Sequence, residues 1–170
     1  MNNNFFIKIS NFFSLINKYA GYICAFLVVL MTANVFVVVL LRYLFGISFI
    51  WMQETYVWMH AYIFMLGAGF TYLNDEHVRI DIIYKSSTPI YRALVDLIGN
   101  IVLLIPFLYI IWIFSYPFVY KSFQMNEISR EAGGLSMLYL LKFAILIFVS
   151  LLFIQAVSKI INSFLNIIKK

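Results

Sequence analysis

The two histidines are the first residues of this chain whose chemistry could define a site. His60 lies within a long apolar run, and His77 follows it by seventeen positions. Histidine nitrogens ligate haem iron and zinc. On one continuous helix these two rings would lie about 25 Å apart, so they cannot share an ion. An intersubunit haem with one histidine from each of two chains stays open, and the simpler role of His60 is a hydrogen bond at a helix contact.

Glu54 is a carboxylate at the edge of the same apolar run, where an ionised side chain is costly enough to suggest a function. Arg42 ends the preceding apolar run on the same predicted side of the membrane and is the obvious partner. A small self-assembling ion channel built around Glu54 would need a polar stripe through the chain, and the sequence shows none. We therefore predict an interfacial carboxylate that pairs with Arg42 or with another subunit.

The segment "NDEHVRIDIIY", residues 74–84, holds three of the seven acidic residues of the chain. In a helix, Asp75 would pair with Arg79, and His77 with Asp81, because residues four apart share a face. In an extended strand, His77, Arg79 and Asp81 would lie on one face together. Either geometry predicts a compact charge cluster, which is a solvated turn or a docking site for a partner.

Motifs for catalysis are missing from the sequence. It contains no GxSxG, HExxH, CxxC or P-loop pattern, and "GAG" at residues 67–69 lies in an apolar run, where small residues permit close helix approach. The Lys and Arg residues are scattered singly, which does not indicate a nucleic-acid partner. The sequence shows no inverted repeat of the kind found in many transporters, so it does not indicate that this chain transports a substrate alone. We therefore expect that the chain is not an enzyme and that it is a membrane subunit that serves a partner protein.

The composition of the chain predicts the kind of secondary structure in which these residues lie. The chain has 170 residues, is 64% hydrophobic and is 11% charged, whereas soluble domains carry roughly 25% charged residues. A bilayer core about 30 Å thick requires roughly 20 helical residues. We predict an all-α integral membrane fold of one domain, residues 1–170, with four transmembrane helices at residues 19–41, 51–73, 97–120 and 135–157.

Three details refine this prediction. Residues 5–18 alternate aromatic and polar side chains at helical spacing, which predicts a separate amphipathic helix in the membrane interface. Pro106 and Pro117 predict a kink or an end in the third span. Sixteen uncharged residues separate Lys142 from Lys159, about 24 Å of helix, so both ammonium groups can reach opposite interfaces.

The orientation follows from the excess of Lys and Arg on the cytoplasmic side of membrane proteins. The flanks of the four predicted spans divide these residues eight to four, which predicts that both termini are cytoplasmic. The larger group is Lys8, Lys18, Arg79, Lys85, Arg92, Lys159, Lys169 and Lys170, and the smaller is Arg42, Lys121, Arg130 and Lys142.

Three segments resemble one family, the small membrane subunit (DctQ-like) of tripartite ATP-independent periplasmic, or TRAP, transporters. The similar segments are "RYLFGISFIWMQETYVW", "LGAGFTYLNDEHVRIDIIY" and "SREAGGLSMLYLLKFAILIFVSLLFIQAVS". Gln53 and Ser136 depart from the family, which often has an acid and a proline there. The resemblance and the residue chemistry together suggest structural or subunit-interface roles for Arg42, Trp51, Glu54, Gly67, His77, Arg79, Asp81, Gly133, Gly134 and Lys142.

The resemblance implies a four-helix scaffold in the bacterial inner membrane. Its partners would be a large membrane subunit, which carries out sodium-coupled uptake of an organic acid, and a periplasmic substrate-binding protein. The chain itself would hold no catalytic, substrate or metal site and no cofactor, and sodium would bind in the large subunit. The alternative is the membrane anchor of a haem- or quinone-linked oxidoreductase.

Overall fold

The computed structural model describes residues 3–77 and 88–168 of the chain. These residues form helices joined by turns and loops, with no strand among them. Arg79 and Asp81, two of the residues singled out in the sequence, lie outside the described residues. The all-α prediction is confirmed for the part of the chain that the structure describes.

The first helix, α1 (Asn3–Phe45), is a single element of 43 residues. The prediction of a separate interfacial helix over residues 5–18 is wrong, because that segment is helical but continues unbroken into the predicted first span. Its polar side chains are used in packing, since Ser10 and Asn17 are buried. A helix of this length extends about 65 Å, which is much more than the thickness of a bilayer core.

The second helix, α2 (Ile50–Leu73), folds back along α1 after a short turn. Gly46 forms this turn with φ of 68°, a left-handed conformation that favours glycine. At its far end the backbone N–H of Asn74 donates to the carbonyl of Phe70, which closes the last helical turn. The 24 residues of α2 agree closely with the predicted second span at 51–73.

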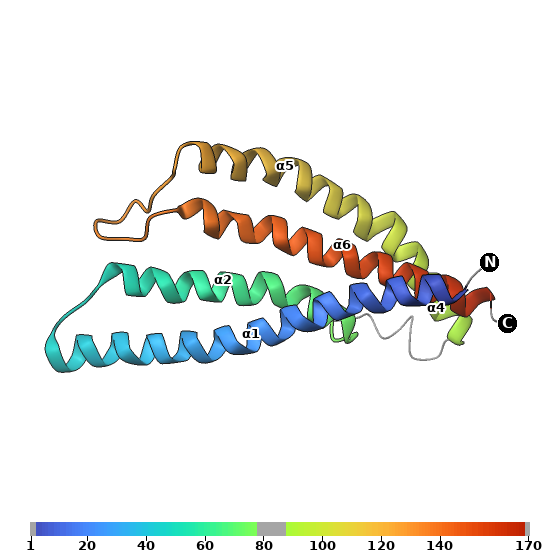
Figure 1. The fold of residues 1–170 in the computed structure, drawn as a ribbon, viewed down its shortest axis with the longest axis horizontal. Coiled ribbons are helices and arrows are strands. Elements are labelled where there is room, and N and C mark those ends of the chain that lie inside the picture. The colour runs from blue at the N-terminus through green and yellow to red at the C-terminus, as the bar shows by residue number, and fades with distance from the viewer. Residues whose placement is uncertain (1–2, 78–87, 169–170) are drawn as a thin grey trace.

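A long bent helix follows, made of α4 (Pro89–Ile98), a π-helical turn η1 (Gly99–Leu104) and α5 (Ile105–Gln124). In the π turn the N–H of Ile105 donates to the carbonyl of Asn100, five residues back. Pro106, which has no N–H to donate, follows directly, and the helix curves along its length (Figure 1). The predicted bend is therefore confirmed, whereas Pro117 lies inside α5 and does not end it.

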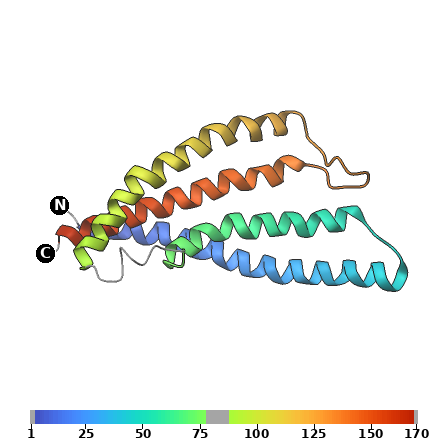
Figure 2. The same cartoon turned by 180° about the vertical axis from the view of Figure 1, so that it is seen from behind.

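The last helix, α6 (Leu138–Ile168), is the common neighbour of the others. It packs against α1, α2, α4 and α5, and it is longer at its C-terminal end than the predicted span 135–157. The N- and C-termini lie at one end of the molecule, and the α1–α2 turn and the α5–α6 loop lie at the other (Figures 1 and 2). We refer to these as the terminal end and the loop end.

Within residues 3–77 and 88–168, three helical stretches are long and apolar enough to cross a membrane. They are Asn4–Phe45, Pro89–Gln124 and Leu138–Ile167. The side chains of α6 are far more buried than those of the other two, as expected for a helix surrounded by its neighbours. The chain is therefore an all-α membrane protein in which α6 holds the helices together.

Candidate functional site

The loop end contains a pair of opposite charges. Lys142, in the first turns of α6, forms an ion pair with Glu127 of the α5–α6 loop. The hydroxyl of Ser122 donates to the same carboxylate oxygen at 2.5 Å, and the Lys142 ammonium lies 4.1 Å from the centre of the Phe118 ring. The hydrogen bond from Lys142, followed by that from Ser122, lowers the pKa of the Glu127 carboxyl. This network ties the loop to both α5 and α6.

Glu54 lies half-buried beneath the same loop. Its carboxylate accepts hydrogen bonds from the hydroxyl of Ser129 and, at 2.5 Å, from the backbone N–H of Leu135. A Cβ on Gly134 would lie 2.8 Å from Glu54 Oε2 and 2.6 Å from Ser129 Oγ, so only glycine leaves room for these bonds. Glu54 therefore joins the start of α2 to the loop that precedes α6.

The expected pairing of Glu54 with Arg42 is wrong for this chain. The acceptor oxygens of Glu54 are used by the loop, and the Arg42 side chain is exposed at the end of α1. Backbone and hydroxyl donors can satisfy a carboxylate as well as a cation does. The sequence could not indicate this because the donors come from a segment 75 and 81 residues away.

Toward the terminal end, α1 and α6 are joined by a buried set of polar side chains. Asn17 Nδ2 donates to Gln155 Oε1 at 3.0 Å and to the carbonyl of Leu151 at 3.3 Å. Nearer the termini, the hydroxyls of Ser10 and Ser158 lie 2.8 Å apart. Asn17 and Ser158 are completely buried, which makes this contact the polar centre of the α1–α6 interface.

Gly69 allows α2 to approach this contact. A Cβ at Gly69 would lie 2.0 Å from Asn17 Oδ1 and 3.2 Å from the Cβ of Leu151. At Gly67, two residues earlier, a Cβ would meet the sulfur of Cys24 at an ordinary 3.8 Å. The close helix approach expected from the small residues 67–69 therefore depends on Gly69.

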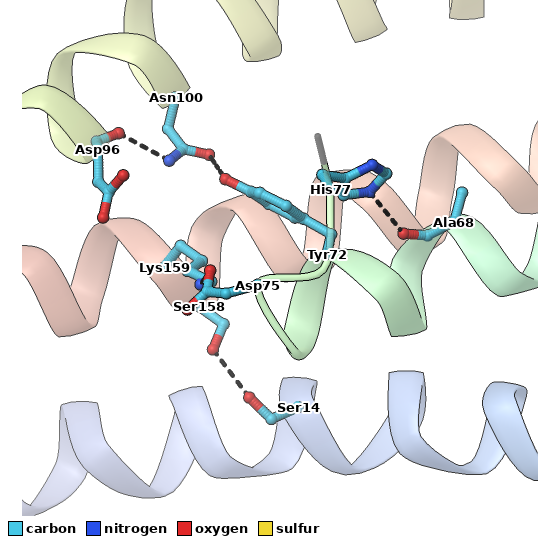
Figure 3. A network of polar contacts seen from close by, with 9 residues as sticks. All are labelled: Ser14, Ala68, Tyr72, Asp75, His77, Asp96, Asn100, Ser158 and Lys159. Carbon is cyan, nitrogen blue, oxygen red and sulfur yellow. Dashed lines mark hydrogen bonds and ion pairs between the residues drawn. The ribbon is translucent and has the colours of Figure 1, made fainter. Parts of the chain in front are cut away.

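A second network at the terminal end joins α2, η1 and α6 (Figure 3). The Tyr72 hydroxyl donates to Asn100 Oδ1 at 2.6 Å, and Asn100 Nδ2 donates to the carbonyl of Asp96 at 2.7 Å. Lys159 of α6 forms an ion pair with Asp75, and its ammonium lies 5.5 Å from the centre of the Tyr72 ring. This contact fixes the end of α2 against α6.

His77 folds back onto the last turn of α2. Its Nε2 lies 3.2 Å from the carbonyl of Ala68 and 3.2 Å from the hydroxyl of Thr71, and its ring centre lies 5.7 Å from that of Tyr72. Figure 3 shows the ring turned toward α2. The predicted pairing of His77 with Asp81 falls on residues outside the described part of the chain.

A family comparison decides the class of this protein. The family model described as tripartite ATP-independent periplasmic transporters, DctQ component, matches residues 27–166. The chain belongs to the DctQ family. It is thus the small subunit of a TRAP transporter, a transport protein and not an enzyme. No curated protein and no solved structure matches the chain.

DctQ membership assigns the chain to transport, in place of the haem- or quinone-linked anchor. The match includes the second half of α1 and nearly all of α6. It includes all of α2, α4, η1 and α5, whereas Ser10 and Asn17 of α1 lie before the matched residues.

The remaining predicted residues of this DctQ protein lie apart from these networks. Trp51 is exposed in the first turn of α2, with its ring 6.2 Å from that of Phe49. Gly133 has a φ of 81°, in the left-handed region, and turns the α5–α6 loop. His60 is exposed on α2.

The polar contact between α1 and α6 is the feature that sequence reasoning missed. Ser10, Ser14 and Asn17 have spacings of four and three residues, and Gln155, Ser158 and Asn162 have spacings of three and four. Each set therefore lies along one helix face. Ser14 and Asn17 were predicted to lie on the polar face of an interfacial helix, but the second set on α6, with similar spacing, indicates that the two helix faces could pair.

An apolar groove of about 600 Å³ runs between α5 and α6 in this DctQ protein. Pro106, Leu108 and Trp112 line one wall, and Val149 and Phe153 line the other. An organic anion needs cationic or hydrogen-bonding partners when it leaves water. The groove offers an environment for hydrocarbon, and no ion pair of the described residues reaches it.

Proposed function

We propose that this small subunit is the fixed scaffold of its transporter. It braces a large membrane subunit in the bacterial inner membrane, and the large subunit carries out sodium-coupled uptake of an organic acid delivered by a periplasmic binding protein. The observation that supports this proposal is that the charged side chains of Lys142, Lys159 and Glu54 have their partners within the chain. Lys142 and Lys159 bind Glu127 and Asp75, and Glu54 binds the α5–α6 loop.

The use of these charges favours a scaffold over a conducting subunit. A carrier for an organic anion and sodium needs unsatisfied cationic and oxygen-rich groups near the middle of the membrane. In this chain the two lysine pairs lie near opposite ends of α6, and the wide groove between them is apolar. We therefore assign substrate and sodium binding to the large subunit, with no cofactor in this chain.

The topology proposed here has four spans, with α2 as the additional one. Its 24 residues extend about 36 Å, and it runs beside α1 from the loop end toward the terminal end. The shared position of the termini agrees with an even number of spans. The eight-to-four division of Lys and Arg supports cytoplasmic termini and a periplasmic loop end, where the binding protein would dock.

Reconstitution tests the proposal. The chain is expressed with and without the large membrane subunit of its transporter, purified through a tag on this chain, and placed in liposomes with a sodium gradient. We expect the large subunit to copurify, and we expect uptake only when the large subunit and the binding protein are both present. Solute flux through the small subunit alone would overturn the scaffold assignment.

A further inference from the structure

One outward face of α2 differs from the other membrane-facing surfaces of the chain. Val57, His60 and Phe64 follow one another at helical spacing, and all three are exposed. We call these three residues the His60 face. Phe64 is 70% exposed, which is high for an aromatic side chain in the middle of a helix that has two packed neighbours.

The two neighbours of α2 occupy its other sides. Gly69 and Phe70 contact α1 through Asn17 and Gly21, and Ala68 and Tyr72 pack on the core formed with α6. The long helix α4–α5 packs mainly on α6 and, among the described residues, meets α2 near its C-terminal end, where Tyr72 donates to Asn100 and packs on the cluster that contains Leu108. The His60 face is therefore left open by the arrangement of the helices.

His60 lies deep along this open face. It is about 15 Å from the start of α2 and about 20 Å from its end, which corresponds to the middle of a bilayer if α2 spans it. No hydrogen bond joins its ring to another described residue. An imidazole at this depth is unfavourable against lipid tails and is stabilised by a hydrogen bond to a neighbouring helix.

The other outward faces suit lipid. In the second half of α1 and along α5 the exposed side chains are mainly aliphatic and aromatic, and Phe36 and Phe114 are examples. The exposed Thr32 hydroxyl of α1 donates to the carbonyl of Val28 in its own helix. Such faces need no protein partner.

We infer that the His60 face is the surface on which a transmembrane helix of the large subunit docks, with a hydrogen-bond acceptor of that helix opposite the His60 ring. This inference rests on the proposed function, in which this chain braces the large subunit. A second copy of the same face would offer only neutral groups, namely its own His60 with Gln53 and Thr71, whose amide N–H and hydroxyl already donate within their own chain. A different polypeptide can supply a free carboxylate or hydroxyl.

Site-directed photocrosslinking tests the position of the contact. The photoreactive amino acid p-benzoylphenylalanine replaces Val57 or Phe64 in the chain coexpressed with its large subunit, and Phe36 and Phe114 are the matched controls on α1 and α5. Illumination of membranes should join the large subunit to positions 57 and 64 and not to the control positions. An adduct with a second copy, or adducts only at the control positions, would overturn the inference.

Substitution of His60 tests the chemistry. We expect His60→Leu to lower the amount of copurified large subunit by about three- to fifteen-fold, the range expected for one hydrogen bond between membrane helices. His60→Gln, which keeps a donor, should retain most of it, and Phe114→Leu should change nothing. Equal copurification by His60→Leu and wild type would contradict the inference, whereas a wild-type chain that never copurifies the large subunit would contradict the proposed function itself.

Discussion

Lys142 and Lys159 lie on the same helix, and each is paired with a carboxylate that the helix does not carry. Lys159 follows Lys142 by seventeen positions, which places their Cα atoms about 26 Å apart along α6. Glu127 reaches Lys142 from the α5–α6 loop, and Asp75 reaches Lys159 from the end of α2. The uncharged segment between the two pairs has nearly the thickness of a bilayer core, so we expect each pair to lie at one membrane interface.

The Glu127 pair should make the stability of the protein depend on pH. The folded-state pKa of Glu127 is lowered, so its stabilisation is fully present above the ordinary carboxyl pKa of about 4.3 and is lost as the pH falls through the folded value. We expect Glu127→Gln to lower the unfolding temperature in detergent at pH 7, with a difference from wild type that shrinks below about pH 4.3. Thermal unfolding between pH 7 and pH 3.5 measures this.

Lys142→Met is the control for that experiment, because the ammonium supplies the main hydrogen bond to Glu127. In the Lys142→Met background, the additional Glu127→Gln substitution should leave the pH dependence nearly unchanged. A full pH-dependent difference in that background would show that Lys142 is not its cause.

Alanine at Gly69 and at Gly67 should have opposite consequences. The added methyl at Gly69 would collide with Asn17 Oδ1, so we expect Gly69→Ala to lower stability by about 1–3 kcal/mol through overpacking. Gly67→Ala meets only ordinary contacts and should be neutral or slightly stabilising, since alanine favours a helix. Unfolding temperatures of the two variants give the comparison, and equal tolerance would contradict the close approach of α1, α2 and α6.

The carboxylate of Glu54 should hold the α5–α6 loop in place and protect it from proteolysis. Glu54→Ala removes two hydrogen bonds to a charged group, each worth about 1.5–3 kcal/mol, so we expect faster proteolysis within residues 125–137. Gly134→Ala should add little in the Glu54→Ala background, because both changes break the same contact.

Gly133→Ala is the matched control, since its effect comes from a left-handed backbone and open space surrounds it. Its effect should add to that of Glu54→Ala. Coupling of Glu54 to Gly133 in place of Gly134 would show that the loop is held differently.

The hydroxyl of Tyr72 should stabilise the protein through its hydrogen bond between α2 and the π turn. Tyr72→Phe leaves Asn100 Oδ1, on a buried side chain, without this donor, and we expect a loss of about 1–3 kcal/mol. Tyr109→Phe is the control, because the Tyr109 ring is 65% exposed. Chemical or thermal unfolding of both variants measures the difference, and equal effects would argue against the Asn100 contact.

The sequence was sufficient to predict the helices because their apolar runs are long and uncharged. Residues 51–73 match α2 closely, and the bend near Pro106 follows from the missing N–H of proline. The boundary at residue 18 was wrong because hydropathy reports only contact with lipid. Polar residues that pair between α1 and α6, such as Ser10 and Asn162, lie outside the predicted spans 19–41 and 135–157, and both helices continue through them.

The partners of the candidate residues were less predictable, because they are brought together by tertiary packing. Lys142 lies in the first turns of α6, but the identity of its partner, Glu127, depends on the path of the loop. The opposite charges of Glu54 and Arg42 predict an ion pair, whereas the fold supplies Glu54 with a hydroxyl and a backbone N–H as donors.

The π turn between Gly99 and Leu104 has a consequence for comparing this chain with its relatives. A π-helical turn contains one more residue than an α-helical turn of the same helix, so it absorbs a single inserted residue without lengthening a loop. Relatives with a regular α-helix here should be one residue shorter at this point. A one-residue gap in an alignment of this membrane helix would then indicate a change of helical register between α4 and α5. Both α4 and α5 would still pack on α6.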